Sequence, residues 1–113
     1  MQHMANYPSL RDRRVFVTGG GTGIGAAIVE AFVAQGAIVA FVDIARDASE
    51  ALCAKLAEAG HRAPQYRHCD ITDIPALQRT MAELAAQLGD VEVLVNNAAN
   101  DQRHEIQDVS LDY

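Results

Sequence analysis

A glycine-dense turn between an apolar run and a helical pattern constrains this chain more than any other feature. Residues 15–17 are Val-Phe-Val, and residues 18–25 read Thr-Gly-Gly-Gly-Thr-Gly-Ile-Gly. Glycines permit a tight bend and let an anionic ligand approach the backbone, while the next helix offers unpaired N–H groups and the positive end of its dipole. The order of strand, glycine turn and helix is therefore typical of a phosphate-binding site.

The spacing of the glycines narrows this interpretation. Gly19, Gly23 and Gly25 follow Thr18 in the pattern T-G-x-x-x-G-x-G, and the simpler G-x-G-x-x-G pattern is absent. A flexible loop would also be rich in glycine, but the strand and helix patterns on either side favour a binding turn. Gly25 falls in the first helical turn, where we expect a side chain to push the helix off the sheet.

Strand-like and helix-like segments alternate along the chain, which predicts an α/β fold. Apolar runs such as residues 38–42 do not alternate with polar residues, as expected for strands buried on both faces of a parallel sheet. Right-handed crossovers then give the strand order 3-2-1-4. The expected strands are residues 14–18, 38–42, 64–69 and 91–96, and the expected helices are residues 23–35, 47–59 and a third capped by Thr72 or Asp73 and ending near Leu88.

The length of 113 residues suits one domain. We predict a Rossmann-type parallel sheet that is truncated after its fourth strand, with residues 1–13 as an irregular lead-in. The third strand is polar enough to be a half-exposed edge. Spacings of i, i+3, i+4 and i+7 predict the helix faces that pack on the sheet. These faces are Ile24, Ala27, Ile28, Ala31 and Phe32 in the first helix, Ala48, Ala51, Leu52 and Leu56 in the second, and Leu77, Met81, Leu84, Ala85 and Leu88 in the third.

Charge and composition exclude several classes of function. A net charge of −6, from 9 basic and 15 acidic side chains, argues against a nucleic-acid partner and suits a soluble cytoplasmic protein. No apolar run reaches the roughly 18 residues of a membrane span, and the first residues lack the apolar core of a secretory signal. Cys53 and Cys69 lie too far apart for a metal or redox motif, the four histidines are scattered, and we expect no metal site.

Three segments, in this order, resemble the short-chain dehydrogenase/reductase family. They are residues 18–25, the Cys-Asp-Ile-Thr of residues 69–72 and the Asn-Asn-Ala-Ala of residues 96–99, and the resemblance extends from about residue 10 to the last residue. The resemblance implies an oxidoreductase that moves a hydride between an alcohol and a nicotinamide cofactor. It also implies a homo-oligomer for the full-length form.

The residue that ends the second strand bears on the choice of cofactor. Asp43 lies 18 residues after Gly25, where a carboxylate can accept both ribose hydroxyls and repels a 2′-phosphate. No basic residue occurs in residues 19–25, which also favours NAD, whereas Arg46 nearby is a feature that NADP enzymes can use. We therefore expect NAD, with an aspartate that merely begins the next turn as the alternative reading of Asp43.

The resemblance also assigns roles after the third and fourth strands. It places Asp70 at the adenine amino group with Ile71 beside the ring, although Asp70 alone is equally suited to capping the following turn. It gives Asn96 a structural role and places Asn97 and the next residue against the cofactor, while an alanine at 99 replaces the usual glycine and puts the backbone contact there in doubt. The predicted cofactor-binding residues are Gly19, Thr22, Gly23, Ile24, Gly25, Asp43, Asp70, Ile71, Asn97 and Ala98.

A finer resemblance concerns the substrate. Residues 96–104 and the Tyr-Pro-Ser-Leu of residues 7–10 are similar to aldose 1-dehydrogenases of the family, such as D-xylose dehydrogenases. This implies hydride transfer from C1 of an aldose to NAD, which gives a lactone. Asn100, Asp101 and His104 would then be candidates for shaping a sugar site, or else solvated loop residues.

The catalytic residues of the family are missing from these 113 residues. Family catalysis uses a Tyr-x-x-x-Lys pair, an upstream serine and an asparagine on the fourth helix. No Tyr-x-x-x-Lys occurs here, and the single lysine, Lys55, falls in the second helix. We expect the chain alone to bind a cofactor without oxidising a sugar. A non-catalytic nucleotide-binding or interaction module is the main alternative, and a methyltransferase would give no reason for Asn96-Asn97-Ala98.

The fourth strand generates a prediction about the isolated chain. Residues 91–95 form an apolar strand whose outer edge has no predicted partner, and such an edge promotes association. We predict that the 113-residue chain is poorly folded, aggregates or pairs edge to edge, and forms no NADH with D-xylose. Light scattering, hydrogen exchange at residues 91–95 and an NAD-reduction assay test this. A monodisperse monomer with slow exchange, or sugar-dependent NADH, would contradict it.

Overall fold

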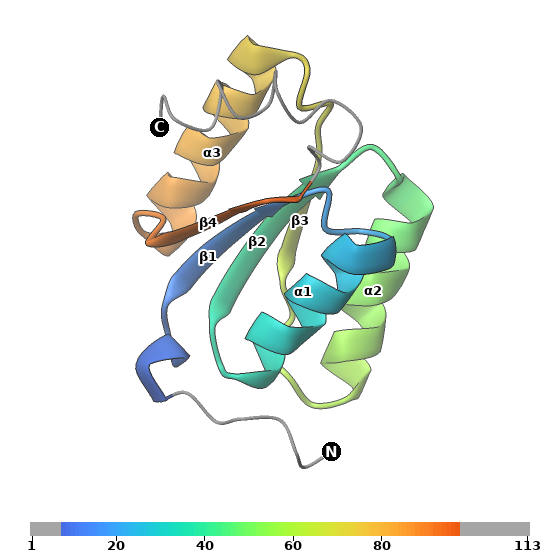
Figure 1. Cartoon of the computed structure of the whole chain (residues 1–113), viewed down its shortest axis with the longest axis vertical. Coiled ribbons are helices and arrows are strands. Elements are labelled where there is room, and N and C mark those ends of the chain that lie inside the picture. Colours follow the sequence, from blue (N-terminus) through green and yellow to red (C-terminus); the bar gives the residue numbers. More distant parts are fainter. Residues whose placement is uncertain (1–7, 98–113) are drawn as a thin grey trace.

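A parallel sheet with helices on both faces forms the described part of the chain, residues 8–97, in the computed structural model (Figure 1). The predicted α/β architecture is confirmed. The strands are β1 (Arg14–Thr18), β2 (Ile38–Asp43), β3 (Gln65–His68) and β4 (Val93–Asn96). The helices are α1 (Gly23–Ala34), α2 (Arg46–Glu58) and α3 (Ile74–Leu88), preceded by a short 3-10 turn, η1 (Pro8–Leu10), within the expected lead-in.

The strand order is β3-β2-β1-β4, as predicted, and every pair of neighbours is parallel. Thr18 at the end of β1 is level with Val42 of β2 and with Asn96 of β4. Both β3 and β4 are shorter than expected at their amino ends. The register brings the carboxyl ends of three strands to the same edge of the sheet, beside the turn that leads into α1.

Alternate residues of β1 enter two separate cores. Val15 and Val17 face α1 and α2, whereas Phe16 faces α3 on the other side of the sheet. All three side chains are at most 1% exposed. The core under α1 and α2 consists of Val15, Val17, Val29, Val33, Ala37, Val39, Phe41, Leu52 and Leu56. The core under α3 consists of Phe16, Ala40, Val42, Cys69, Leu77 and Leu84.

The face that α1 turns to the sheet differs from the predicted one. Gly25, Val29 and Val33 are buried, while Ala27 is exposed and Ile24 is 68% exposed. This helix is apolar nearly all the way round, so the spacing of apolar residues could not select one face. The selection comes from packing, because Gly25 lies against the carbonyl of the preceding turn, where no side chain fits.

For the second helix, one residue of the predicted buried face was wrong, whereas the buried residues of the third helix agree with the prediction. In α2 the buried residues include Ser49, whereas Ala51, which the spacing predicted to be internal, is exposed. In α3, Leu77 and Leu84 are buried as predicted. Asp73 caps α3 by accepting a 3.1 Å hydrogen bond from the Ala76 amide, which confirms the predicted helix start.

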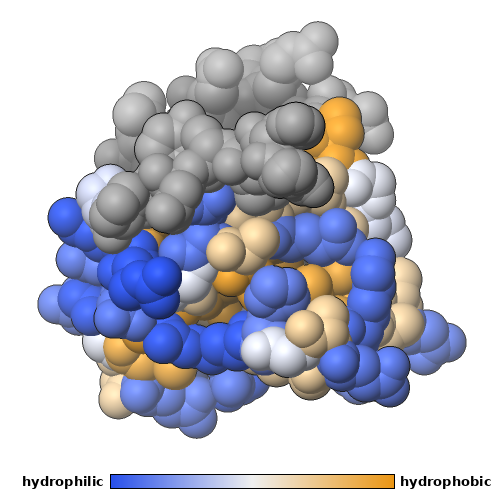
Figure 2. Space-filling model, turned by 90° about the horizontal axis from the view of Figure 1, so that it is seen from below, coloured by the Kyte–Doolittle hydropathy of each residue, from blue (hydrophilic) through white to orange (hydrophobic). Residues whose placement is uncertain are grey.

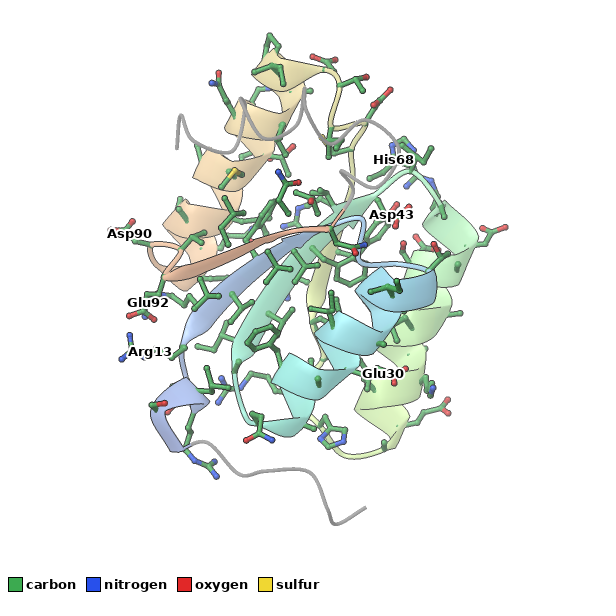
Figure 3. All side chains as sticks on the ribbon, viewed as in Figure 1. Arg13, Glu30, Asp43, His68, Asp90 and Glu92 are labelled. Carbon is green, nitrogen blue, oxygen red and sulfur yellow. The ribbon has the colours of Figure 1, made fainter. Side chains whose placement is uncertain are left out.

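Charged groups tie β4 to β1 at the amino edge of the sheet. Oε1 of Glu92 accepts a 3.0 Å hydrogen bond from the Arg14 amide, and its Oε2 lies 3.3 Å from the Arg13 guanidinium. The Arg14 hydrogen bond and the two arginine charges hold the pKa of Glu92 below its usual range. Figure 3 shows Arg13 and Glu92 at the end of the sheet opposite Asp43. Seen from below, the visible surface is mostly hydrophilic around a smaller hydrophobic area (Figure 2).

Among the described residues, β4 pairs with β1 alone, and all four of its residues are only half buried. Beside it lies a hollow of about 400 Å³ between β4 and α3. The residues that line this hollow are Met81, Ala82, Ala85, Val91, Glu92 and Leu94. The outer side of β4 is therefore less covered than a central strand of a parallel sheet normally is, and the association expected of this edge stays a prediction.

Candidate functional site

Four segments that are distant in sequence meet at the carboxyl edge of the sheet. They are the turn before α1, the end of β2, the turn between β3 and α3, and the end of β4 (Figure 1). A hollow of about 180 Å³ opens between the first three segments. Its lining residues are Gly19, Asp43, Ile44, Cys69, Asp70 and Ile71. Four of the predicted site residues thus share one hollow, and ligands commonly bind at this edge of open α/β sheets.

The turn itself lies over the end of β2. The amides of Gly19 and Gly20 both donate to the Val42 carbonyl, at 2.8 and 3.2 Å. Thr22 is the N-cap residue of α1, yet its side chain makes no capping hydrogen bond. The helix therefore begins without the usual side-chain partner for its first N–H groups, and such groups favour an anion. Thr22, Gly23 and Ile24 are all exposed at this end of α1.

Gly25 is where the turn and the helix come closest together. A Cβ atom at this position would collide with the Gly19 carbonyl oxygen and would lie 2.8 Å from Nδ2 of Asn97. That Nδ2 atom donates a 3.1 Å hydrogen bond to the same carbonyl. The absence of a side chain at 25 thus lets the turn, α1 and the end of β4 meet at one carbonyl group.

The two asparagines that end β4 hold different parts of the turn. Asn96 accepts a 2.9 Å hydrogen bond at Oδ1 from the hydroxyl of Thr18, the last residue of β1. This contact across neighbouring strands agrees with the structural role expected for Asn96. The Asn97 side chain instead donates to the Gly19 carbonyl, so it stabilises the glycine turn directly.

Asp43 ties the turn to the loop after β2. Its Oδ2 accepts a 2.9 Å hydrogen bond from the Gly21 amide, and its Oδ1 accepts a 2.8 Å hydrogen bond from the Ala45 amide. The Tyr66 hydroxyl donates to the Asp43 carbonyl at 2.9 Å. Since a carboxylate offers about four acceptor positions, each oxygen can still accept another hydrogen bond. The two sequence interpretations of Asp43, a turn former and a ligand, are therefore compatible.

Asp70 acts as a turn former in this structure. Its Oδ1 accepts hydrogen bonds from the Thr72 amide at 3.0 Å and from the Thr72 hydroxyl at 2.7 Å. These two bonds lower the pKa of Asp70, so the carboxylate stays ionised well into the acid range. The described residues give its other oxygen, Oδ2, no hydrogen bond, which leaves an acceptor at the rim of the hollow. Ile71 lines the same hollow and is half buried.

Ile44 is a residue at the hollow that the sequence analysis did not single out. It follows Asp43 directly and is 65% exposed, which is unusual for a large apolar side chain. An isoleucine directly after a strand-ending aspartate was the available signal. Cys69 lies in the wall, and burial raises the pKa of its thiol, in keeping with the small apolar residue that was expected.

Several predictions fall outside the described residues. Ala98 is one of the predicted cofactor-binding residues among them, and the candidate sugar-site residues Asn100, Asp101 and His104 are others. Within residues 8–97, no helix is both long and apolar enough to cross a bilayer. The same residues contain no group of three or more histidine, cysteine or acidic side chains arranged to hold a metal ion.

The contact at Gly25 generates a test. Gly25→Ala should destabilise the fold, because the methyl group must displace the Gly19 carbonyl or the Asn97 amide, and overpacking of this kind costs about 1–3 kcal/mol. Gly23→Asn is the matched control, since Gly23 has a φ of 56° that asparagine tolerates and nothing lies within 4 Å of a Cβ there. Urea denaturation should show the larger loss for Gly25→Ala, and equal losses would contradict the contact.

Comparison with known proteins gives a consistent result. The family model described as short chain dehydrogenase matches residues 13–112. A probable galactose dehydrogenase of Rhizobium meliloti is 52% identical over 106 residues, and the D-xylose 1-dehydrogenase of Caulobacter vibrioides is 49% identical over 106 residues. Each match covers 94% of this chain and 41% of the relative. The chain thus spans about two fifths of the length of these curated relatives.

Solved structures agree with the sequence matches. A double mutant of a Serratia marcescens short-chain dehydrogenase/reductase superposes with a TM-score of 0.74 at 37% identity, covering 80% of this chain and 37% of that chain. A short chain dehydrogenase from Mycobacterium smegmatis gives a TM-score of 0.74 at 28% identity, covering 81% of this chain and 39% of that chain. The strand order, the glycine turn and these matches together establish that the chain belongs to the short-chain dehydrogenase family.

Proposed function

We propose that this chain forms the NAD-binding part of a short-chain dehydrogenase that oxidises an aldose at C1. The observation that carries the proposal is the Asp43 carboxylate, which lies at the end of β2 and is hydrogen-bonded to the glycine turn through the Gly21 amide. A carboxylate beside a phosphate-binding turn suits a nucleotide whose ribose hydroxyls are both free. NAD, when bound, accepts the hydride, and this chain's residues bind and orient it.

Each predicted residue has a role under this proposal. The turn from Gly19 to Gly25, including Thr22, Gly23 and Ile24, would receive the pyrophosphate on backbone N–H groups. The adenine would enter the hollow lined by Ile44 and Ile71, where Oδ2 of Asp70 is an acceptor for its amino group. Asn97, which supports the Gly19 carbonyl, and Ala98 would lie on the side toward the nicotinamide.

The preference for NAD over NADP rests on charge. A 2′-phosphate close to Asp43 would meet a carboxylate that two backbone amides hold in place, so the carboxylate cannot easily turn away. Arg46 is exposed at the start of α2 and is the nearby side chain that would favour a phosphate. The Asp43 carboxylate is hydrogen-bonded directly to the glycine turn, through the Gly21 amide. The described residues give no such bond between an arginine and the turn, and this supports NAD.

The substrate proposal has a different support, namely the relatives. The two relatives at about 50% identity are named as a galactose dehydrogenase and a D-xylose 1-dehydrogenase. We extend that substrate class, an aldose oxidised at C1, to the whole protein to which this site contributes. Because the 113 residues contain no Tyr-x-x-x-Lys, the groups that act on the sugar would come from outside them.

A charge-removing variant tests the cofactor assignment. Asp43→Asn should weaken NAD binding about tenfold, as expected for loss of a charge-assisted hydrogen bond worth roughly 1.5 kcal/mol, and should weaken NADP binding less or improve it. The difference between the affinities for NAD and for NADP should therefore become smaller. Calorimetric titration with both cofactors, on the chimera described below, measures this difference in affinity, and Asp47→Asn, an exposed charge removal at the start of α2, should leave it unchanged.

Two outcomes would contradict this assignment. One is equal affinity for NAD and NADP in the chimera that retains Asp43. The other is that Asp47→Asn reduces the difference between the NAD and NADP affinities as much as Asp43→Asn does. The effect of Asp43→Asn would then come from overall charge and not from the site. Because Asp43→Asn also presents an NH₂ group to one of two amides, urea denaturation of each variant should accompany the titrations.

A chimera tests the substrate proposal. Residues 1–113 would replace the matching segment of the Caulobacter vibrioides D-xylose 1-dehydrogenase, whose remaining length supplies the rest of that enzyme. We expect NAD-dependent oxidation of D-xylose by the chimera and none by the 113-residue chain, measured as NADH absorbance. A folded chimera that binds NAD and oxidises no aldose would contradict the proposal, and a chimera with Asp43→Asn provides the internal control for cofactor use.

A further inference from the structure

One buried polar atom beside the candidate site has no partner among the described residues. It is the hydroxyl oxygen of Ser49, on α2, a residue with no exposed surface. Buried hydroxyl groups in proteins are nearly always hydrogen-bonded, because leaving one unpaired destabilises the fold. An unpaired hydroxyl next to a ligand site therefore calls for a physical explanation.

The surroundings of Ser49 point towards Asp43. A Cβ atom on Gly21 would collide with the Ser49 Oγ atom and would also lie 3.2 Å from Cγ and Oδ2 of Asp43. The serine hydroxyl and the carboxylate thus converge on the same side of Gly21. Ser49 is also linked to the loop that Asp43 organises, because its amide donates to the Ala45 carbonyl at 3.0 Å while the Ala45 amide donates to Oδ1 of Asp43.

The Tyr66 hydroxyl is the other polar neighbour. It donates its proton to the Asp43 carbonyl at 2.9 Å. Burial raises the pKa of Tyr66, and the side-chain interaction with Ser49 lowers this pKa and so partly offsets the rise. Of the two acceptors near Ser49, the phenol oxygen belongs to a neutral hydroxyl, whereas the Asp43 carboxylate has unused acceptor positions. The carboxylate is therefore the stronger acceptor for the serine proton.

We propose that Ser49 is a positioning residue for Asp43. Its hydroxyl donates to Oδ2 of Asp43 when a ribose occupies the site, and this bond holds the carboxylate against the Gly21 amide while the ribose hydroxyls bind from outside. The inference rests on the proposed binding of NAD at Asp43. It explains both why a polar residue is buried at 49 and why position 21 has no side chain.

The single variant Ser49→Ala distinguishes a role in positioning Asp43 from a role in packing. Ser49→Ala retains nearly the same volume and removes the hydroxyl. In the chimera described above, we expect it to weaken NAD binding three- to tenfold in calorimetric titration, while the midpoint of urea denaturation of the NAD-free chimera stays the same or rises, because an unpaired group has gone. Ser9→Ala, an exposed serine outside the site, is the control and should change neither quantity.

A double-mutant cycle locates the partner of Ser49. In an Asp43→Asn background, Ser49→Ala should have little further effect on NAD affinity. In a Tyr66→Phe background, it should keep its full effect. For a readout that needs no substitution at the site, the Ser49 hydroxyl proton should become visible by NMR when NAD is added to the chimera, because a buried, bonded hydroxyl exchanges slowly.

The outcomes distinguish the two proposals. If Asp43→Asn leaves the NAD and NADP affinities unchanged, the proposed function fails first. If Asp43→Asn changes them and Ser49→Ala does not weaken NAD binding, the role of Ser49 alone is refuted. That role is also refuted if Ser49→Ala acts equally in the Asp43→Asn background, if Tyr66→Phe abolishes its effect, or if the hydroxyl proton stays invisible with NAD bound.

Discussion

The contact between the first turn of α1 and the Gly19 carbonyl is the constraint on which the rest of the site depends. With no side chain at Gly25, the helix approaches the turn closely enough for one carbonyl to lie beside Gly25 and accept from Asn97. This fixes the rotation of α1, and so turns Val29 and Val33 into the core and leaves Ile24 outside. A backbone contact, rather than the amount of apolar surface, decides which face of the helix is buried.

A second constraint comes from the Asp43 carboxylate. This group stabilises the fold and is also a candidate ligand for a cofactor. It bridges the glycine turn and the loop before α2, and Tyr66 of β3 holds its backbone carbonyl. A substitution at Asp43 therefore changes the shape of the turn as well as the charge of the site. Conservative variants that retain its size separate these effects better than alanine, because they disturb the two amides less.

The two ends of the sheet carry different kinds of contacts. At the amino edge, the ion pairs of Arg13 and Arg14 with Glu92 fasten β4 to β1, and nothing there suggests a binding site among the described residues. At the carboxyl edge, where Figure 3 labels Asp43, two aspartates and two isoleucines line a hollow together with Gly19 and Cys69. Under the proposed function, this edge would hold the cofactor, while the groups that act on the sugar would come from outside these 113 residues.

The sequence by itself determined the elements, their order, the parallel sheet and the position of the turn. Local signals suffice for these features: glycine spacing, apolar runs and capping residues such as Asp73 act over a few neighbouring positions. The hollow could also be anticipated, because parallel strands bring Asp43 and Asp70 to one edge. Tertiary structure alone decided the buried face of α1, the burial of Ser49 and the exposure of Ile44. These depend on contacts between residues far apart in the chain, such as Gly21 with Ser49, and periodicity along one helix carries no information about them.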